Sequence, residues 1–423
     1  MEVDEKNVTL ASVGSQVSTV EPPMLPRLRQ RIETQFQRRW EDEWGCRLPT
    51  QGRKPTPDAV RLDGNDYLGL TGHSSIVQAQ IDALRHNQEF VVQSVVFQHD
   101  GGATARLEEA LAKHLGKERA MLSQSGYAAN LGLLQVIADA ETPVYLDGLA
   151  HMSLWEGVRA ANAPAHAFRH NDPEHLARLI QRHGPGLVVI DSVYSTTGAI
   201  CPLTRMVEIV EEHGCMILVD ESHSLGTHGP QGRGLCAELG LTHRVHFITA
   251  SLAKAFAGRA GVFTVPESLR AFMVAHNYPG IFSSCLLPHE IAGLAATLDV
   301  VRQSDHARAR LHANTRRIRA AIAAAGYPIH QGTEQIIALE AGTEIEMLRL
   351  RDALESRGVF GAVFCAPATS RNRAMVRLTL SAALTEADMT HLERVLHEIA
   401  PLMKPWEWPI ARRARARALE AQS

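Results

Sequence analysis

The stretch CMILVDESHSLGTHG (residues 215–229) begins with an apolar run that ends at Asp220 and then reaches His223. A second apolar run opens VHFITASLAKAFAGRAG (245–261), which carries Lys254 in the turn that follows. Both runs have the length and the β-branched content of buried strands. We therefore expect two strands that bring an acid, a histidine and a lysine to one edge of a sheet.

The same alternation extends outward from these two runs. AMLSQ (120–124), PVYLD (143–147) and GLVVIDSV (186–193) read as strands, and each is followed by a helical pattern. GVFTV (261–265) follows the lysine turn so closely that it can pair antiparallel. Strands that alternate with helices over this length predict an α/β fold with a doubly wound, mostly parallel sheet. Ligands bind such sheets at the carboxyl ends of the strands.

The two ends of the chain read differently. Residues 25–44 place Leu28, Ile32, Phe36 and Trp40 at helical spacing, which predicts an amphipathic helix. Such a helix can dock on another surface or subunit, or equally on its own chain. After Pro288 a long helical segment, broken at most once, leads into a β-α-β-β-α pattern. The predicted regions are a tail with the amphipathic helix (1–60), a large cofactor-binding domain (61–290) and a smaller α+β domain (291–423).

Composition narrows the class of protein. The 423 residues are 45% apolar and 21% charged, with a net charge of −3, as in a globular enzyme that neither nucleic acid nor a membrane surface attracts. The six cysteines form no CxxC and no metal-like spacing with histidine, which indicates reduced thiols and no metal site. The polar start is not a signal peptide, and no apolar run has the length of a membrane span. We therefore expect a cytoplasmic protein.

The acid and the lysine suit one cofactor, pyridoxal phosphate. A lysine amine such as Lys254 condenses with the cofactor aldehyde as a Schiff base. An acid such as Asp220 keeps the pyridine nitrogen protonated, so the ring can take up electrons from a carbanion. His223 is placed to donate to the ring oxygen O3′, and Ser251 to hold the phosphate. A lone lysine on a loop is usually a solvated charge, so the prediction depends on the combination.

Three other strand ends carry polar residues with a structural alternative. Ser125, Gly126 and Tyr127 open a helix, where free N–H groups suit a phosphate, although a plain strand-to-helix turn looks the same. His151 can lie flat on a cofactor ring, but taken alone it is more simply a packing histidine. Ser195 lies in a polar turn that can reach the ring oxygen or be no more than a capped turn.

One arginine lies inside an apolar strand near the C-terminus. Arg377 occurs in AMVRLTLSAA (374–383). A buried arginine requires a carboxylate, which can come from a structural ion pair or from an amino-acid substrate.

As an ordered set, eight stretches resemble the α-oxoamine synthases, pyridoxal-phosphate enzymes of fold type I. They are NDYLGL (65–70), SGYAANLGLL (125–134), HMSLWEG (151–157), DSVYSTTGAICPL (191–203), VDESHSLGTHGPQGRG (219–234), TASLAKAFAGRAG (249–261), FSSCLLP (282–288) and VRLTLSAA (376–383). The resemblance implies a large doubly wound domain with a smaller α+β C-terminal domain. It also implies a homodimer whose active sites lie at the interface.

The resemblance assigns a role to each matching residue. It implies a Schiff base at Lys254, a pyridine contact at Asp220, O3′ contacts at His223 and Ser195, ring stacking at His151, cofactor framing at Ser125, Gly126 and Tyr127, phosphate binding at Ser251, a reach into the partner subunit's phosphate site at Ser283 and Ser284, and substrate-carboxylate binding at Arg377.

Departures from the family pattern point to one branch. QSVVFQHDGGATARLEE (93–109) lacks the arginine of the family's glycine-rich stretch, the lysine motif is SLAK (251–254), and the arginine strand ends in SAAL (381–384). These features look most like the branch that makes long-chain α-hydroxyketone quorum-sensing autoinducers. That branch joins a medium- or long-chain acyl-CoA to S-adenosylmethionine or 2-aminobutyrate. Because residues 93–104 depart from the family pattern, the family's usual acyl-CoA contacts are not assigned to residues of this sequence.

Three rival interpretations remain. The first is a primary-metabolism member of the family, such as 8-amino-7-oxononanoate synthase, glycine C-acetyltransferase or 5-aminolevulinate synthase. The second is a non-catalytic partner subunit on this fold, as in serine palmitoyltransferase, but such a subunit can lack the lysine that is present here. The third, a nucleotide-binding Rossmann protein, has no GxGxxG motif in its favour.

Overall fold

The fold is described by a computed structural model that covers residues 24–86, 93–329 and 334–413. The predicted N-terminal tail, residues 1–23, lies outside the described residues. The chain divides into two compact units at Leu48 and Pro49.

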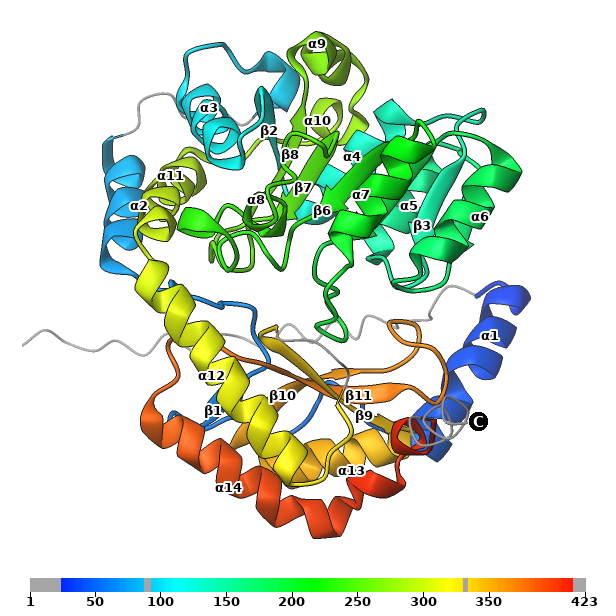
Figure 1. Cartoon of the computed structure of the whole chain (residues 1–423). Helices are drawn as coiled ribbons and strands as arrows, with labels where there is room; N and C mark the ends of the chain where they lie inside the picture. Colours follow the sequence, from blue (N-terminus) through cyan, green and yellow to red (C-terminus); the bar gives the residue numbers. More distant parts are fainter. Residues whose placement is uncertain (1–23, 87–92, 330–333, 414–423) are drawn as a thin grey trace, which may run out of the picture. The chain divides into compact units, whose positions relative to one another are not determined.

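The first unit contains the predicted amphipathic helix. Helix α1 (Pro26–Ile32) continues as π-helical turns at Glu33–Gln37 and Arg39–Glu43 (Figure 1). Leu28, Ile32 and Phe36 are exposed, whereas Trp44 at the end of the segment is buried. The segment predicted as a helix over residues 25–44 is helical, with α-helical geometry at Pro26–Ile32 and π-helical turns after it.

The larger sheet of the second unit explains why one edge collects the polar residues. Its seven strands among the described residues have the order β2-β8-β7-β6-β5-β3-β4. Neighbours from β7 to β4 pair parallel, whereas β8 is antiparallel to both β7 and β2. The doubly wound, mostly parallel sheet and the antiparallel strand after the lysine turn are thus confirmed. The strands are β2 (Arg119–Ser123), β3 (Val144–Asp147), β4 (Ala165–Phe168), β5 (Leu187–Asp191), β6 (Met216–Asp220), β7 (Phe247–Ser251) and β8 (Gly261–Val265).

Helices connect most of these strands and flank the sheet in the chain, and local sequence signals set several helix ends. The Asp172 side chain accepts a hydrogen bond from His175 N–H and caps α6, with Pro173 at the first helical position. Gly116 ends α3 with a φ of +67°, which a residue with a side chain rarely adopts. The helices are α2 (Ser74–His86), α3 (Ala103–Leu115), α4 (Gly126–Ile137), α5 (Met152–Ala160), α6 (Pro173–His183), α7 (Leu203–Glu212), α8 (Leu235–Glu238), α9 (Glu267–His276) and α10 (Tyr278–Ile281).

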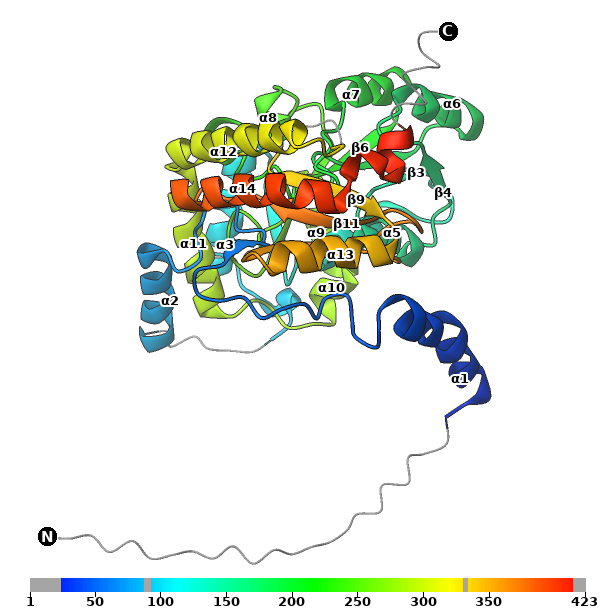
Figure 2. The same ribbon diagram turned by 90° about the horizontal axis from the view of Figure 1, so that it is seen from below.

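The smaller sheet confirms the predicted β-α-β-β-α pattern and adds one strand to it. Its order is β1-β10-β11-β9, in which β1 pairs parallel and the others antiparallel. Helices α13 and α14 lie over this sheet (Figure 2). The elements are β1 (Val60–Leu62), β9 (Ile336–Gly342), β10 (Val359–Phe364), β11 (Ala374–Thr379), α13 (Glu344–Glu355) and α14 (Glu386–Met403).

A long helical segment connects the two sheets. Helix α11 (Pro288–Arg302) begins with Pro288 at its first position, and α12 (Asp305–Ala324) follows after a break at Gln303 and Ser304. The single break allowed by the sequence is therefore present (Figure 1). Of the helices within the described ranges, none combines the length and apolar character needed to cross a membrane.

Strand register places the acids. Asp191 at the end of β5 is level with Asp220 at the end of β6, and Asp220 is level with Thr249 on β7. The strands themselves are buried and rich in Val, Ile and Leu. Their apolar interior anchors the sheet, so the polar groups at the carboxyl ends have fixed positions.

Candidate active site

Asp220 is a buried carboxylate held by neutral donors. Its Oδ2 accepts a hydrogen bond from Asn130 Nδ2 at 2.7 Å, and its Oδ1 accepts one from Ser222 N–H at 2.8 Å. Within the described ranges no side chain forms an ion pair with it. A buried carboxylate without a cation is costly, so this site favours a ligand that brings positive charge.

Lys254 follows β7 in a tight turn and is half-buried. Burial lowers the pKa of its amine, the guanidinium of Arg377 lowers it further, and Asp220 raises it. A lower pKa increases the fraction of neutral amine, which is the form that attacks an aldehyde or accepts a proton. The structure therefore brings both Asp220 and Arg377 within electrostatic reach of Lys254.

His223 lies in the same buried region. Its Nδ1 is 2.5 Å from the Tyr67 hydroxyl. Burial, followed by the positive charges of Lys254 and Arg377, holds the pKa of His223 well below its ordinary value. The imidazole is therefore neutral and carries a single N–H.

His151 caps helix α5 at the end of β3 and is not packed into the core. Its backbone N–H donates to Asp191 Oδ2 at 3.0 Å, and its Nδ1 lies 2.7 Å from Ser153 Oγ. Ser153 Oγ also accepts a hydrogen bond from Asn130 Nδ2 at 2.9 Å. A chain of hydrogen bonds therefore links His151 through Ser153 and Asn130 to Asp220.

The start of α4 forms a close-packed cradle. Ser125 caps the helix by accepting a hydrogen bond from Ala128 N–H at 3.1 Å. A Cβ atom on Gly126 would lie 2.6 Å from Ser251 Cβ, and one on Gly261 would lie 2.2 Å from Ser125 O. No side chain fits at either glycine, so the start of α4 packs directly against Ser251 and Gly261. A helix start offers unpaired N–H groups that suit a phosphate. Tyr127 borders the cradle and is 45% exposed.

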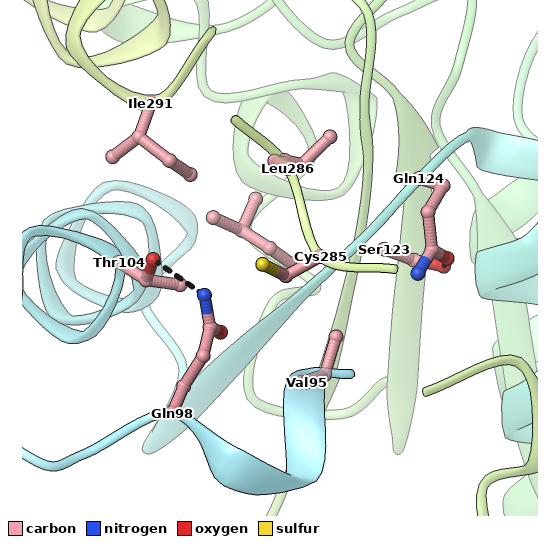
Figure 3. Close-up of a pocket in the computed structure, with 9 residues that line it drawn as sticks. Val95, Gln98, Thr104, Ser123, Gln124, Cys285, Leu286 and Ile291 are labelled. Atoms are coloured by element: carbon pink, nitrogen blue, oxygen red, sulfur yellow. Dashed lines mark hydrogen bonds between the residues drawn. The ribbon is translucent and has the colours of Figure 1, made fainter. Parts of the chain in front are cut away.

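Ser283 and Ser284 lie on a neighbouring segment. Gln124, directly before the cradle, donates from Nε2 to Ser284 O at 2.7 Å, and Ser284 bridges to Ser94. Beside this contact, Gln98 and Thr104 are joined by a 3.2 Å hydrogen bond across a pocket that Cys285 also lines (Figure 3). The stretch 93–104, which departs from the family pattern, therefore contacts the segment that carries Ser283 and Ser284.

Arg377 reaches the site from the smaller sheet. It is buried on β11, donates from Nη1 to Ser195 O at 2.7 Å and from Nη2 to Asn65 Oδ1 at 3.1 Å. Its guanidinium carbon lies 4.7 Å from the centre of the Phe364 ring. No carboxylate among the described residues pairs with it, so the structural ion pair considered from the sequence is not found there. Its charge can therefore serve a substrate carboxylate.

These groups fit pyridoxal phosphate. Asp220 offers an anion that a protonated pyridine nitrogen would neutralise, Lys254 offers the amine, and the α4 start offers phosphate donors. Sequence reasoning missed the supporting residues Asn130 and Asp191. Asn130 lies one helical turn after Gly126, but no sequence signal connects it to Asp220, 90 positions later.

Comparison with known proteins decides the family. The sequence matches the model of aminotransferase class I and II over residues 57–396. It is 48% identical over 341 residues to a CAI-1 autoinducer synthase from Vibrio campbellii, covering 81% of this chain and 86% of that protein. It is 32% identical over 345 residues to an 8-amino-7-oxononanoate synthase from Salmonella arizonae, covering 80% and 88%. The chain belongs to the α-oxoamine synthase family.

Membership agrees with the fold. A serine palmitoyltransferase from S. paucimobilis, solved with a PLP–myriocin aldimine, superimposes with a TM-score of 0.83 at 25% sequence identity. The match covers 89% of this chain and 99% of that one. The chain is thus a pyridoxal-phosphate-dependent acyltransferase of fold type I, and the cofactor and enzyme class expected from its sequence are confirmed.

Proposed function

We propose that this chain is an acyl-CoA:amino-acid C-acyltransferase that makes the α-aminoketone or enaminone precursor of an α-hydroxyketone autoinducer. The substrates are a medium- or long-chain acyl-CoA and S-adenosylmethionine or 2-aminobutyrate. The condensation releases CoA and the amino-acid carboxylate as carbon dioxide, which gives the α-aminoketone. The enaminone forms when the side chain of S-adenosylmethionine is eliminated as well. One observation carries the proposal. Buried Arg377 has no carboxylate partner among the described residues and lies within electrostatic reach of the Lys254 amine. The higher identity to the CAI-1 synthase than to 8-amino-7-oxononanoate synthase favours the branch.

The residues divide the chemistry. Bound pyridoxal phosphate supplies an electron sink for a carbanion at the substrate Cα. Arg377 holds the substrate carboxylate and so sets which Cα bond faces Lys254. The Lys254 amine, whose pKa is lowered by burial, accepts the Cα proton as a general base.

The other site residues hold the cofactor in place. Asp220 would keep the ring nitrogen charged, and His151 would stack on the ring. His223 and Ser195 would contact the ring oxygen O3′, and the residues that would hold the cofactor at its phosphate end are Ser125, Gly126, Tyr127 and Ser251.

A homodimer completes the proposal. Exposed aromatic side chains surround the segment that carries Ser283 and Ser284: Phe282 is 78% exposed, Phe97 63% and Tyr278 54%. Monomers rarely leave such side chains together in water, so this surface is suited to a second copy of the chain. The two serines then reach the cofactor phosphate of the partner subunit. A cytoplasmic location, where acyl-CoA is available, is part of the same proposal.

Substitution of the lysine tests the function directly. Lys254→Ala should abolish both the visible absorbance of the bound cofactor and the condensation, measured with a panel of acyl-CoAs and amino donors and mass spectrometry of the product. Normal turnover with an unchanged absorbance band would refute the role of Lys254. A preference of the unmodified chain for glycine with acetyl- or pimeloyl-type acyl groups would favour the primary-metabolism alternative. A chain that binds no cofactor would favour the non-catalytic subunit.

A further inference from the structure

A buried tyrosine touches the imidazole that faces the cofactor site. Tyr67 follows β1 in the loop Asn65–Leu70 and is fully buried. Its carbonyl accepts a hydrogen bond from Ala382 N–H at 2.8 Å, and Gly69 turns there with a φ of +72°. This loop therefore has a fixed position against the end of β11, and the Tyr67 hydroxyl has a fixed position 2.5 Å from His223 Nδ1.

The direction of this hydrogen bond follows from the protons available. Burial raises the pKa of Tyr67 far above its ordinary value, so the hydroxyl keeps its proton. The Gln335 amide, whose Nε2 donates to His223 O at 2.8 Å, lowers the pKa of Tyr67 in part but does not reverse the effect of burial. The other acceptor for the Tyr67 proton, Asn65 Oδ1, is 3.4 Å away and already accepts a hydrogen bond from Arg377 Nη2. The Tyr67 proton is therefore directed to His223 Nδ1.

The other ring nitrogen of His223 must then carry the histidine proton. The ring is neutral and has a single N–H, which cannot be at Nδ1 if that atom accepts from Tyr67. No described residue is hydrogen-bonded to Nε2. The nearby charged or titratable groups, Lys254, Arg377 and His151, all belong to the site.

We propose that Tyr67 is a positioning residue that fixes His223 as the Nε2–H tautomer, so that this N–H donates to the O3′ oxygen of the bound cofactor. The proposal rests on the proposed function for the identity of the acceptor oxygen. The tautomer itself depends on Tyr67 and His223 alone. Neither the sequence motifs nor the family resemblance assigned a role to Tyr67.

The first experiment measures the tautomer of His223 in the absence of the cofactor. Nitrogen NMR of the full chain with labelled histidine, purified free of pyridoxal phosphate, should show His223 with an unprotonated Nδ1 and a protonated Nε2. The signal is assigned by its loss in His223→Gln. In Tyr67→Phe the same signal should become an average over both tautomers. A protonated Nδ1 in the unmodified chain overturns the proposal, whatever reaction the enzyme catalyses.

The second experiment reads the consequence in the cofactor-loaded enzyme. A donor to O3′ stabilises the oxygen as an anion, so its loss should raise the pH midpoint of the cofactor's absorbance change. For Tyr67→Phe we expect an upward shift of about half to one pH unit, the size of one hydrogen bond. In the His223→Gln background the same substitution should shift the midpoint by less than about 0.2 units, because the effect acts through His223.

A matched control separates positioning from stability. Tyr327 is also buried, and its hydroxyl donates to Leu396 O at 3.1 Å in the smaller domain. Tyr327→Phe removes a comparable hydrogen bond and should leave the absorbance midpoint unchanged. Equal shifts for Tyr67→Phe in the presence and absence of His223 would show a merely structural role and overturn the proposal. Failure of the chain to bind pyridoxal phosphate would refute the proposed function. The NMR measurement of the His223 tautomer would then decide alone whether Tyr67 positions His223.

Discussion

Burial and mutual repulsion set the protonation of the side chains around Lys254. Burial is the largest cause that lowers the pKa of Lys254, His223 and His151, and the positive charges nearby add to it. Arg377 also has a lowered pKa because of burial, but a guanidinium remains protonated at neutral pH. The site therefore combines bases whose neutral forms are favoured by burial with one permanent cation. Such a combination suits proton transfer beside a bound carboxylate.

A buried histidine outside the site gives a test of stability against pH. His228 Nε2 lies 2.6 Å from Glu334 Oε2, and both residues are buried. Burial lowers the pKa of His228, but the Glu334 carboxylate outweighs it, so the pKa is raised overall. Because the folded-state pKa of His228 is raised, its charged pair with Glu334 contributes fully to stability below about pH 6.5. This contribution is lost as the pH rises through the folded-state pKa.

Glu334→Gln should remove this pH dependence. Between pH 6 and pH 9 the thermal midpoint of the unmodified chain should fall more steeply than that of the variant. The slopes of the free energy of unfolding against pH should differ by an amount that approaches the effect of one proton, about 1.4 kcal/mol per pH unit, between the unfolded-state and folded-state pKa of His228. Parallel curves for the two proteins would show that His228 is not charged in the folded state.

Residues that act through local patterns could be predicted from the sequence, and residues that act through distant contacts could not. Asp220 and Lys254 each follow an apolar run, so their place at a strand end was visible. Asn130 bonds Asp220 from a helix 90 positions earlier in the chain, and Tyr67 meets His223 across 156 positions. No spacing rule connects such pairs, because the fold alone brings them together.

At the scale of elements, length decided what could be predicted. The five-residue buried strands β5, β6 and β7 have enough apolar residues to be recognised. Strand β1 has three residues, and it pairs with β10 from the far end of the chain. Its place in the smaller sheet was therefore not anticipated. That pairing positions the loop that carries Asn65 and Tyr67.

The tight start of α4 gives a prediction at the scale of an element. In Gly126→Ala the new methyl group would overlap Ser251, at 2.6 Å from its Cβ and 2.8 Å from its Cα. Helix α4 must then move away from β7, at a cost of about 1–3 kcal/mol. We expect pyridoxal phosphate to bind at least about tenfold more weakly, by fluorescence titration.

A second glycine supplies the control for this substitution. A Cβ atom on Gly64 meets no atom within 4 Å, and Gly64→Ala should leave both stability and cofactor affinity unchanged. Wild-type affinity in Gly126→Ala would show that the cradle does not hold the phosphate.

At the scale of the whole molecule, both sheets of the second unit contribute to one site. The larger sheet supplies Asp220, Lys254 and the acid that holds His151, and the smaller sheet supplies Arg377. The contacts of Arg377 with Ser195 and Asn65 fasten the smaller sheet to the turn after β5 and to the loop after β1. Substrate binding at Arg377, as proposed, would therefore be coupled to the position of one sheet against the other.

The proposed dimer makes a prediction that a monomeric enzyme would not. Ser283→Asp/Ser284→Asp adds negative charge where the proposal places the partner's phosphate, so this variant should retain the cofactor poorly and lose activity. Lys254→Ala is inactive for a different reason. When the two variants are unfolded and refolded together, half of the dimers should be mixed, and each mixed dimer has one intact site.

The unselected mixture should therefore recover about a quarter of the wild-type activity per chain, measured by product formation. Mixed dimers selected by affinity tags on both chains should show about half. The control is each variant refolded alone, which should stay inactive. No recovery in verified mixed dimers would mean that Lys254, Ser283 and Ser284 serve a site within one chain. In that case the exposed aromatic surface around Phe282 would bind a partner other than a second copy of the chain, because exposure of this apolar area to water is unfavourable.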